Sequence, residues 1–129
     1  KEIPKLLETF SLTGIEKQSF DEYSRGNKQK FSILSALSHS PKLLVVDEPI
    51  VGLDPISADI AKKLFKEYAE QGGAVLLVTH TLSVAEEIST HIGFLKNGQL
   101  VATGTLEGLR KTAEVEDDAS LETIYKTLA

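Results

Sequence analysis

The sequence predicts an α/β fold built on a parallel β-sheet, and three features predict it. Residues 43–46 and 74–79 are almost continuous apolar runs, which is the composition of strands in parallel sheets covered on both faces. The segment between them has helical spacing, and strand–helix–strand is the unit that places two strands parallel in one sheet. Residues 91–104 carry the pair Asn97-Gly98 between two strand-like stretches, which predicts a β-hairpin.

Two helices are predicted before the first strand. Residues 4–10 are predicted to form a short amphipathic helix. It begins at Pro4, because proline is favoured at the first helical position. Residues 11–23 are a polar connector without a clear pattern. The second helix begins after Ser24, a natural N-cap, and ends before Pro41.

The helix between the strands has equally clear ends. Asp54 is its predicted N-cap, Pro55 its first residue, and Gly72-Gly73 its end. Its apolar side chains recur at four-residue steps, with one more beside them, and this predicts the buried face: Ile56, Ile60, Leu64, Tyr68 and Phe65.

Three further helices are predicted in the C-terminal part. A short helix follows the second strand, capped by Ser83 in a capping box or by Thr81 instead. Another helix runs from Thr105 through Arg110. A final helix after an acidic segment carries its apolar side chains at helical spacing: Leu121, Ile124, Tyr125 and Leu128.

Two adjacent acids, Asp47 and Glu48, end the first apolar strand. Ligands in open parallel sheets bind at the carboxyl ends of the strands. Asp47 therefore suits a Mg²⁺ ligand, since Mg²⁺ takes one or two carboxylates together with substrate phosphates. Glu48 could orient or deprotonate an attacking water. The alternative is that both acids only solvate a turn, although the apolar strand before them and the sequence GLDP after them favour a site.

Two other features point to phosphate. His80 ends the second parallel strand, where it is either a structural cap or a phosphate contact close to the two acids. The segment YSRGNKQK, residues 23–30, starts a helix, and a helix N-terminus with free N–H groups binds phosphate readily. The other reading of that segment is a plain N-cap made by Ser24. His39 and His91 receive no function.

Composition excludes several classes of function. The chain of 129 residues suits one domain, and it has a formal net charge of −5 with no basic run. Nucleic acid is therefore not an expected partner. The chain contains no cysteine, so disulfides and thiolate chemistry are excluded. No apolar run is long enough for a membrane span. It also contains no methionine, so we expect it to be processed or to be part of a longer protein.

Four motifs occur in a characteristic order: YSRGNKQK (23–30), LLVVDEP (43–49), VGLD (51–54) and LLVTH (76–80). They resemble the signature motif, the Walker B motif, the D-loop and the switch histidine of the ATP-binding cassette (ABC) ATPases. The resemblance implies a partial P-loop NTPase fold with a RecA-like parallel core, flanking helices and a C-terminal hairpin. It places the end of the helical signature subdomain in residues 1–40 and the core in residues 41–129.

The resemblance also assigns roles. Asp47 would hold Mg²⁺ through water, Glu48 would be the catalytic carboxylate, and His80 would contact the γ-phosphate of ATP. Asp54 would lie in the loop that crosses between two nucleotide-binding domains.

The signature residues would act across that dimer. Ser24, Gly26 and Asn27 match positions that contact ATP bound on the opposite domain. Arg25 stands where the commonest signature has glycine, and it would add positive charge near phosphate. Asn27 stands in place of glutamine and has a shorter reach.

One motif of the family is absent. A phosphate-gripping loop reads G-x-x-x-x-G-K-[ST], and the chain has no Gly-Lys pair. We therefore expect the C-terminal part of a nucleotide-binding domain, which is inactive alone. A strand expected between residues 74–79 and 92–95 would also be missing, so the hairpin should shift to close the gap or the chain should self-associate.

The implied protein is the ATPase subunit of an ABC transporter, with similarity to exporter types in YS and in ASLETIYKTL. It would bind a second nucleotide-binding domain and a transmembrane permease, on the cytoplasmic face of the membrane. Two alternatives remain open. One is a soluble ABC ATPase of DNA repair or translation, and the other is a truncated module that supplies only the signature half-site.

Overall fold

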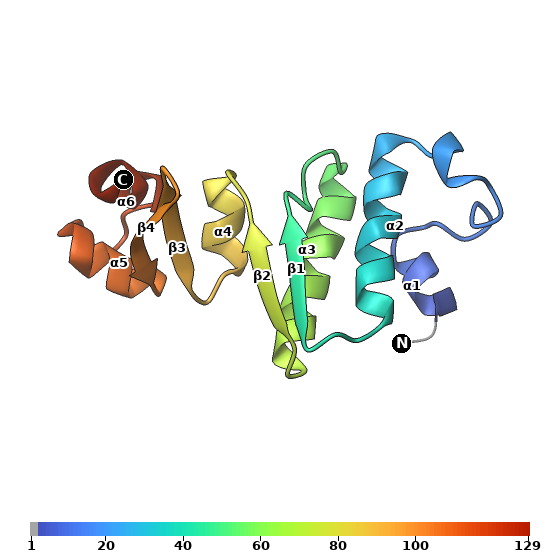
Figure 1. Ribbon diagram of the computed structural model, residues 1–129, viewed down its shortest axis with the longest axis horizontal. Helices are drawn as coiled ribbons and strands as arrows, with labels where there is room; N and C mark the ends of the chain where they lie inside the picture. Colours follow the sequence, from blue (N-terminus) through green and yellow to red (C-terminus); the bar gives the residue numbers. More distant parts are fainter. Residues whose placement is uncertain (1–2) are drawn as a thin grey trace. The chain divides into compact units, whose positions relative to one another are not determined.

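The computed structural model describes residues 3–129, which form two compact units, one up to Val78 and one from Thr79 (Figure 1). The predicted boundary at residue 40, between the helical signature subdomain and the core, is not the boundary between these two units. It stays a prediction. Residues 1 and 2, which belong to its first part, lie outside the described residues.

The first unit holds the predicted βαβ arrangement and the helices before it. Its elements are α1 (Ile3–Thr9), a short 3-10 turn (Phe20–Glu22), α2 (Arg25–Ser38), β1 (Leu43–Asp47), α3 (Pro55–Glu70) and β2 (Ala74–Val78). The predicted helices and both predicted strands are confirmed, with ends that differ by one or two residues.

Tyr23 anchors the connector for which the sequence showed no clear pattern. Its hydroxyl donates a 2.6 Å hydrogen bond to the carbonyl of Ile15. Its ring stacks on that of Phe31 in α2, with the ring centroids 4.6 Å apart. The end of the connector is therefore held against α2 by Tyr23, through contacts that the hydrophobic spacing of the sequence does not reveal.

Strands β1 and β2 pair in parallel, with Val45 opposite Leu76. Leu44 is buried, whereas alternate residues on the other face are largely exposed: Leu43, Val45, Leu76 and Val78. The apolar composition led us to expect strands covered on both faces. Within the described residues of the first unit, no element covers this face.

Helix α3 begins and ends where the sequence predicts, but its buried face is rotated. The buried residues are Ser57, Ala61, Leu64, Phe65 and Tyr68. The prediction was wrong for Ile56, which is 74% exposed. Each four-residue step rotates about 40° beyond a full turn, so a residue two steps before Leu64 has left the buried face.

The turn from α3 to β2 requires both of its glycines. Gly72 has φ +93°, a conformation that glycine adopts without a steric penalty. Gly73 donates to the carbonyl of Tyr68 at 3.1 Å, and a Cβ atom on Gly73 would overlap the Tyr68 ring. The predicted end of the helix is therefore confirmed, with a packing reason for the second glycine.

The second unit contains α4 (Leu82–Ile88), β3 (Ile92–Lys96), β4 (Gln99–Gly104), α5 (Leu106–Ala113) and α6 (Leu121–Leu128). Thr81 occupies the N-cap position of α4, so the Ser83 capping box was wrong. Glu86, the other member of that box, instead accepts a 3.1 Å hydrogen bond from the backbone N–H of Leu121. This bond ties α4 to the start of α6.

The predicted hairpin is confirmed, with positive φ at both turn residues, 51° at Asn97 and 77° at Gly98. The core of this unit lies between the hairpin and the helices, and it consists of Ile92, Phe94, Leu109, Ala113, Leu121 and Ile124. The strands of the described chain form two separate two-stranded sheets. The expectation that the hairpin shifts to close the gap or that the chain self-associates stays a prediction.

Candidate functional site

The two acids lie at the carboxyl end of the parallel strands, as the sequence predicts. Asp47 is the last residue of β1 and is exposed, and Glu48 follows it and is half-buried. The backbone N–H of Glu48 donates a 2.9 Å hydrogen bond to the carbonyl of Val78, the last residue of β2. Glu48 is thereby fixed to the neighbouring strand at the point where both strands end.

Glu48 also turns the chain away from the sheet. Its φ is +46°, which is the left-handed region that non-glycine residues rarely adopt. Such backbone costs on the order of 1 kcal/mol and is common at functional sites. Two tight turns follow, closed by bonds from Val51 to Glu48 and from Leu53 to Ile50, both 3.2 Å.

This loop ends at Asp54, the predicted N-cap of α3. Its carboxylate accepts from both the backbone N–H (3.0 Å) and the hydroxyl (2.6 Å) of Ser57. Lys30 of α2 lies 3.5 Å from the same carboxylate. The Ser57 hydroxyl first, then the Ser57 amide and the charge of Lys30, lower the pKa of Asp54 from 3.8 to about 2. The capping role is confirmed, and nucleotide binding by Asp54 stays a prediction.

The N-terminus of α2 has the expected cap. The Ser24 hydroxyl accepts a 3.2 Å hydrogen bond from the backbone N–H of Asn27. Ser24 and Arg25 are exposed, and Gly26 and Asn27 are half-buried. Because the first residues of a helix have no intrahelical acceptor for their N–H groups, this end of α2 suits an anion. The plain N-cap made by Ser24 is confirmed, and phosphate binding by this segment stays a prediction.

Helix α2 and the loop after the acids touch closely. A Cβ atom on Gly26 would lie 3.2 Å from the carbonyl oxygen of Gly52, and Gly52 itself has φ +86°. Side chains reach the loop from the same side of α2: the Gln29 amide donates to the carbonyl of Pro49 at 3.1 Å. The structure thus joins the candidate phosphate-binding helix to the candidate catalytic loop.

Sequence reasoning gave no role to Gln29 or Lys30. A signal was available, since Gly26, Gln29 and Lys30 have the spacing that places residues on one face of a helix. It could not be used without knowing that this face packs on the loop after β1.

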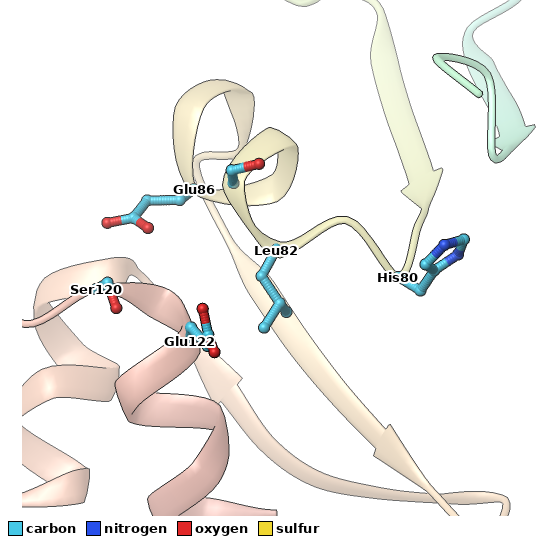
Figure 2. A pocket seen from close by; sticks show the side chains of 6 residues that line it. His80, Leu82, Glu86, Ser120 and Glu122 are labelled. Atoms are coloured by element: carbon cyan, nitrogen blue, oxygen red, sulfur yellow. The ribbon is translucent and has the colours of Figure 1, made fainter. Parts of the chain in front are cut away.

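His80 follows β2 by two residues and belongs to the second unit. It lines a pocket together with residues of α4 and the start of α6: Leu82, Ser83, Glu86, Ser120 and Glu122. Figure 2 shows the His80 ring directed away from Ser120 and Glu122. Its predicted closeness to Asp47 and Glu48 stays a prediction.

The other histidines make local contacts. His39 is the C-cap of α2, with its Nδ1 atom 3.0 Å from the carbonyl of Ser35. His91 lies in the bend before β3. Within residues 3–129, no group of three or more His, Cys, Asp or Glu side chains is arranged to hold a metal ion. Mg²⁺ usually binds one or two carboxylates of a protein, and phosphate oxygens and water complete its coordination shell. The exposed carboxylate of Asp47 is compatible with such a ligand.

A family model described as "AAA domain, putative AbiEii toxin, Type IV TA system" matches residues 2–86. This range includes α2, the parallel strands and the loop with the two acids, and it covers more than half of the chain. The chain therefore belongs to the AAA-type domains, and its fold corresponds to part of a P-loop NTPase domain. Within this class, the chain belongs to the ATP-binding cassette ATPases, because the curated relatives and the solved structures that match it are ATP-binding proteins of ABC transporters.

Curated relatives support this assignment. The chain is 35% identical to the ABC-type transporter ATP-binding protein EcsA of Bacillus subtilis, over 99% of this chain and 51% of the relative. It is 38% identical to the bacitracin transport ATP-binding protein BcrA of Enterococcus faecalis, over 84% of this chain and 36% of BcrA. The chain thus spans about half the length of EcsA and less of BcrA.

Solved structures of ATP-binding cassettes support the same family assignment. A structure of the ATP-binding subunit of an ABC transporter matches with a TM-score of 0.93 and 34% identity, covering 98% of this chain and 52% of that one. A dimeric ATP-binding cassette in a post-hydrolysis state with bound ADP and Pi matches with a TM-score of 0.71 and 27% identity, covering 80% of this chain and 45% of that one. In residues 3–129 no helix combines the length and apolar character that crossing a membrane requires.

Proposed function

We propose that this chain is part of the ATP-hydrolysing subunit of an ABC transporter and supplies its catalytic carboxylate and its signature helix. One observation carries the proposal. Glu48 is held at the carboxyl end of the parallel strands by its bond to Val78, while the N-terminus of α2 packs on the loop that follows it. A carboxylate and a phosphate-binding helix end are thus linked in one unit.

Asp47 and Glu48 divide the chemistry between them. Asp47 would hold Mg²⁺, which supplies charge stabilisation to the phosphates of ATP. Glu48 orients the attacking water and accepts its proton. His80 serves as a γ-phosphate contact in the complete site.

A dimer brings in the remaining residues. Ser24, Arg25, Gly26 and Asn27 contact the triphosphate bound on a second nucleotide-binding domain, and Asp54 lies at the crossing between the two domains. The exposure of Ser24 and Arg25 agrees with this role. The dimeric cassette with ADP and Pi that resembles this chain gives it further support.

Hydrolysis in this dimer would drive substrate movement through a transmembrane permease, at the cytoplasmic face of the membrane. An exporter is the favoured type, because the YS and ASLETIYKTL segments resemble exporter types. The relatives include bacitracin and lantibiotic transport ATP-binding proteins. The absence of a Gly-Lys pair in the sequence agrees with a chain that needs the rest of its protein for activity.

The experiment is Glu48→Gln in the full-length protein. The amide preserves the shape but cannot accept the proton, so we expect kcat to fall by about 10²–10⁴-fold while ATP binding is retained. The control is Glu70→Gln, an exposed glutamate at the end of α3, which should hydrolyse ATP as the wild type does. Turnover by Glu48→Gln within tenfold of the wild type would show that another residue is the catalytic base.

A further inference from the structure

We propose that Gln29 is a positioning residue for Glu48, holding the catalytic carboxylate in register with the N-terminus of α2. The inference rests on the proposed function and deepens it. It concerns a residue outside the acids and the exposed signature turn, and it assigns no contact between Gln29 and nucleotide.

Gln29 contacts the residue next to the proposed catalytic carboxylate. Its Nε2 atom donates a 3.1 Å hydrogen bond to the carbonyl oxygen of Pro49, the residue directly after Glu48. The Pro49 side chain is fully buried. Proline has no backbone N–H, so its carbonyl is the only backbone group through which this position can be held by a hydrogen bond.

Glu48 is consequently fixed from two sides. On its N-terminal side, its own N–H bonds to the carbonyl of Val78 in β2. On its C-terminal side, the carbonyl of Pro49 accepts a hydrogen bond from Gln29 in α2. Because Glu48 has the uncommon φ of +46°, its backbone gains from being held at the peptide before it and at the peptide that follows Pro49.

The approach of α2 makes this bond possible. Gly26 lies one turn before Gln29 on the same face, and a Cβ atom there would come within 3.2 Å of the Gly52 carbonyl. Gly26 therefore lets the helix lie against the loop, and Gln29 then reaches Pro49. A displacement of the α2 N-terminus when it meets a triphosphate is transmitted through this bond to the Pro49 carbonyl, one residue after Glu48.

The test separates positioning from plain structural support. In the full-length protein, Gln29→Leu keeps the approximate size of the side chain but removes the N–H donor. Gln29→Lys keeps a donor with sufficient reach. Since misplacing a catalytic group by about 1 Å can cost about 10²-fold, we expect Gln29→Leu to lower kcat by about tenfold or more. The KM for ATP should change by less than about twofold, because Gln29 does not bind nucleotide.

Gln29→Lys should restore kcat to within about threefold of the wild type, because the donor to Pro49 is regained. Ser32→Ala is the matched control on α2, since the Ser32 hydroxyl is exposed and bonds only within the helix, to the Lys28 carbonyl. It should leave kcat and KM unchanged. The melting temperatures of all variants are measured alongside.

Two results would overturn the positioning role: a wild-type kcat in Gln29→Leu, or an equal loss of kcat in Gln29→Lys. A fall in melting temperature with kcat unchanged would show that the bond only stabilises the fold. These results leave the proposed function intact if Glu48→Gln is still inactive. Full turnover by Glu48→Gln would instead remove the catalytic role proposed for Glu48, whatever the Gln29 variants do.

Discussion

The ammonium nitrogen of Lys30 lies 3.5 Å from the Asp54 carboxylate, which joins α2 to the residue that caps α3. The Lys30 side chain is only 15% exposed, whereas that of Asp54 is 53% exposed. An ion pair open to water on one side contributes little by itself. Its importance is geometric, because it closes the loop that begins at Glu48.

The lowered pKa of Asp54 predicts a dependence of stability on pH. The ordinary pKa is 3.8 and that in the folded chain is about 2, so ionised Asp54 stabilises the fold above 3.8. This contribution is lost as the pH falls through about 2. We expect Asp54→Asn to be less stable than the wild type at neutral pH, and the difference to close as the pH falls across that window. Urea unfolding of the full-length protein at several pH values measures it. A constant difference across the window would contradict the lowered pKa.

The origin of that shift can be tested separately. The Ser57 hydroxyl is the largest cause and Lys30 a smaller one. Ser57→Ala should therefore raise the pKa of Asp54 more than Lys30→Gln does, as followed by NMR titration of the carboxyl group. The reverse order would show that the ion pair dominates the cap.

A second prediction separates the two roles of Ser24. Its hydroxyl caps α2 through the N–H of Asn27, and removing it in Ser24→Ala should lower the free energy of unfolding by about 1 kcal/mol. Ser24→Asp keeps an N-cap acceptor but places a negative charge where the triphosphate is proposed to lie. We expect near wild-type thermal stability with kcat lowered at least tenfold, measured on the full-length protein. Normal turnover in Ser24→Asp would argue that this helix end does not meet phosphate.

The parts of the fold that the sequence predicted correctly depend on local chemistry. Asp54 and Ser24 cap their helices because a short side-chain oxygen can reach an N–H three residues later, whatever surrounds it. Asn97 and Gly98 form the hairpin turn because their backbone tolerates positive φ. The ends of most elements were therefore predictable.

The errors arose where packing decides. Ile56 was assigned to the buried face from its spacing, but only the position of α3 on the sheet decides which face is buried. At the site, the positions of Asp47 and Glu48 were predictable, because these two residues end an apolar strand. The role proposed for Gln29 was not, since its hydrogen bond spans 20 residues to Pro49 and exists only after α2 packs on the loop.

A third prediction concerns the chain of 129 residues produced alone. It should neither hydrolyse ATP nor bind MgATP with micromolar affinity, because it has no G-x-x-x-x-G-K-[ST] sequence to hold the phosphates. Titration calorimetry, after circular dichroism has shown the chain to be folded, measures this. Micromolar binding would show that the N-terminus of α2 and the acids suffice for the nucleotide.

The last prediction concerns the uncovered face of the β1–β2 sheet. Val45 and Leu76 are paired neighbours on this face, 59% and 53% exposed, with Leu43 and Val78 beside them. Contiguous apolar side chains on a sheet tend to associate, because burying them removes apolar area from water. We expect the isolated chain to sediment as dimers or larger species at micromolar concentration.

The variant Val45→Lys with Leu76→Lys should shift the isolated chain toward the monomer, since two like charges on the paired positions oppose association through this face. The control is Ile56→Lys, which removes an apolar side chain of similar size that is 74% exposed on α3, away from the sheet. That variant should sediment as the unsubstituted chain does. A monomeric wild-type chain, or equal effects of both variants, would show that this face does not drive association.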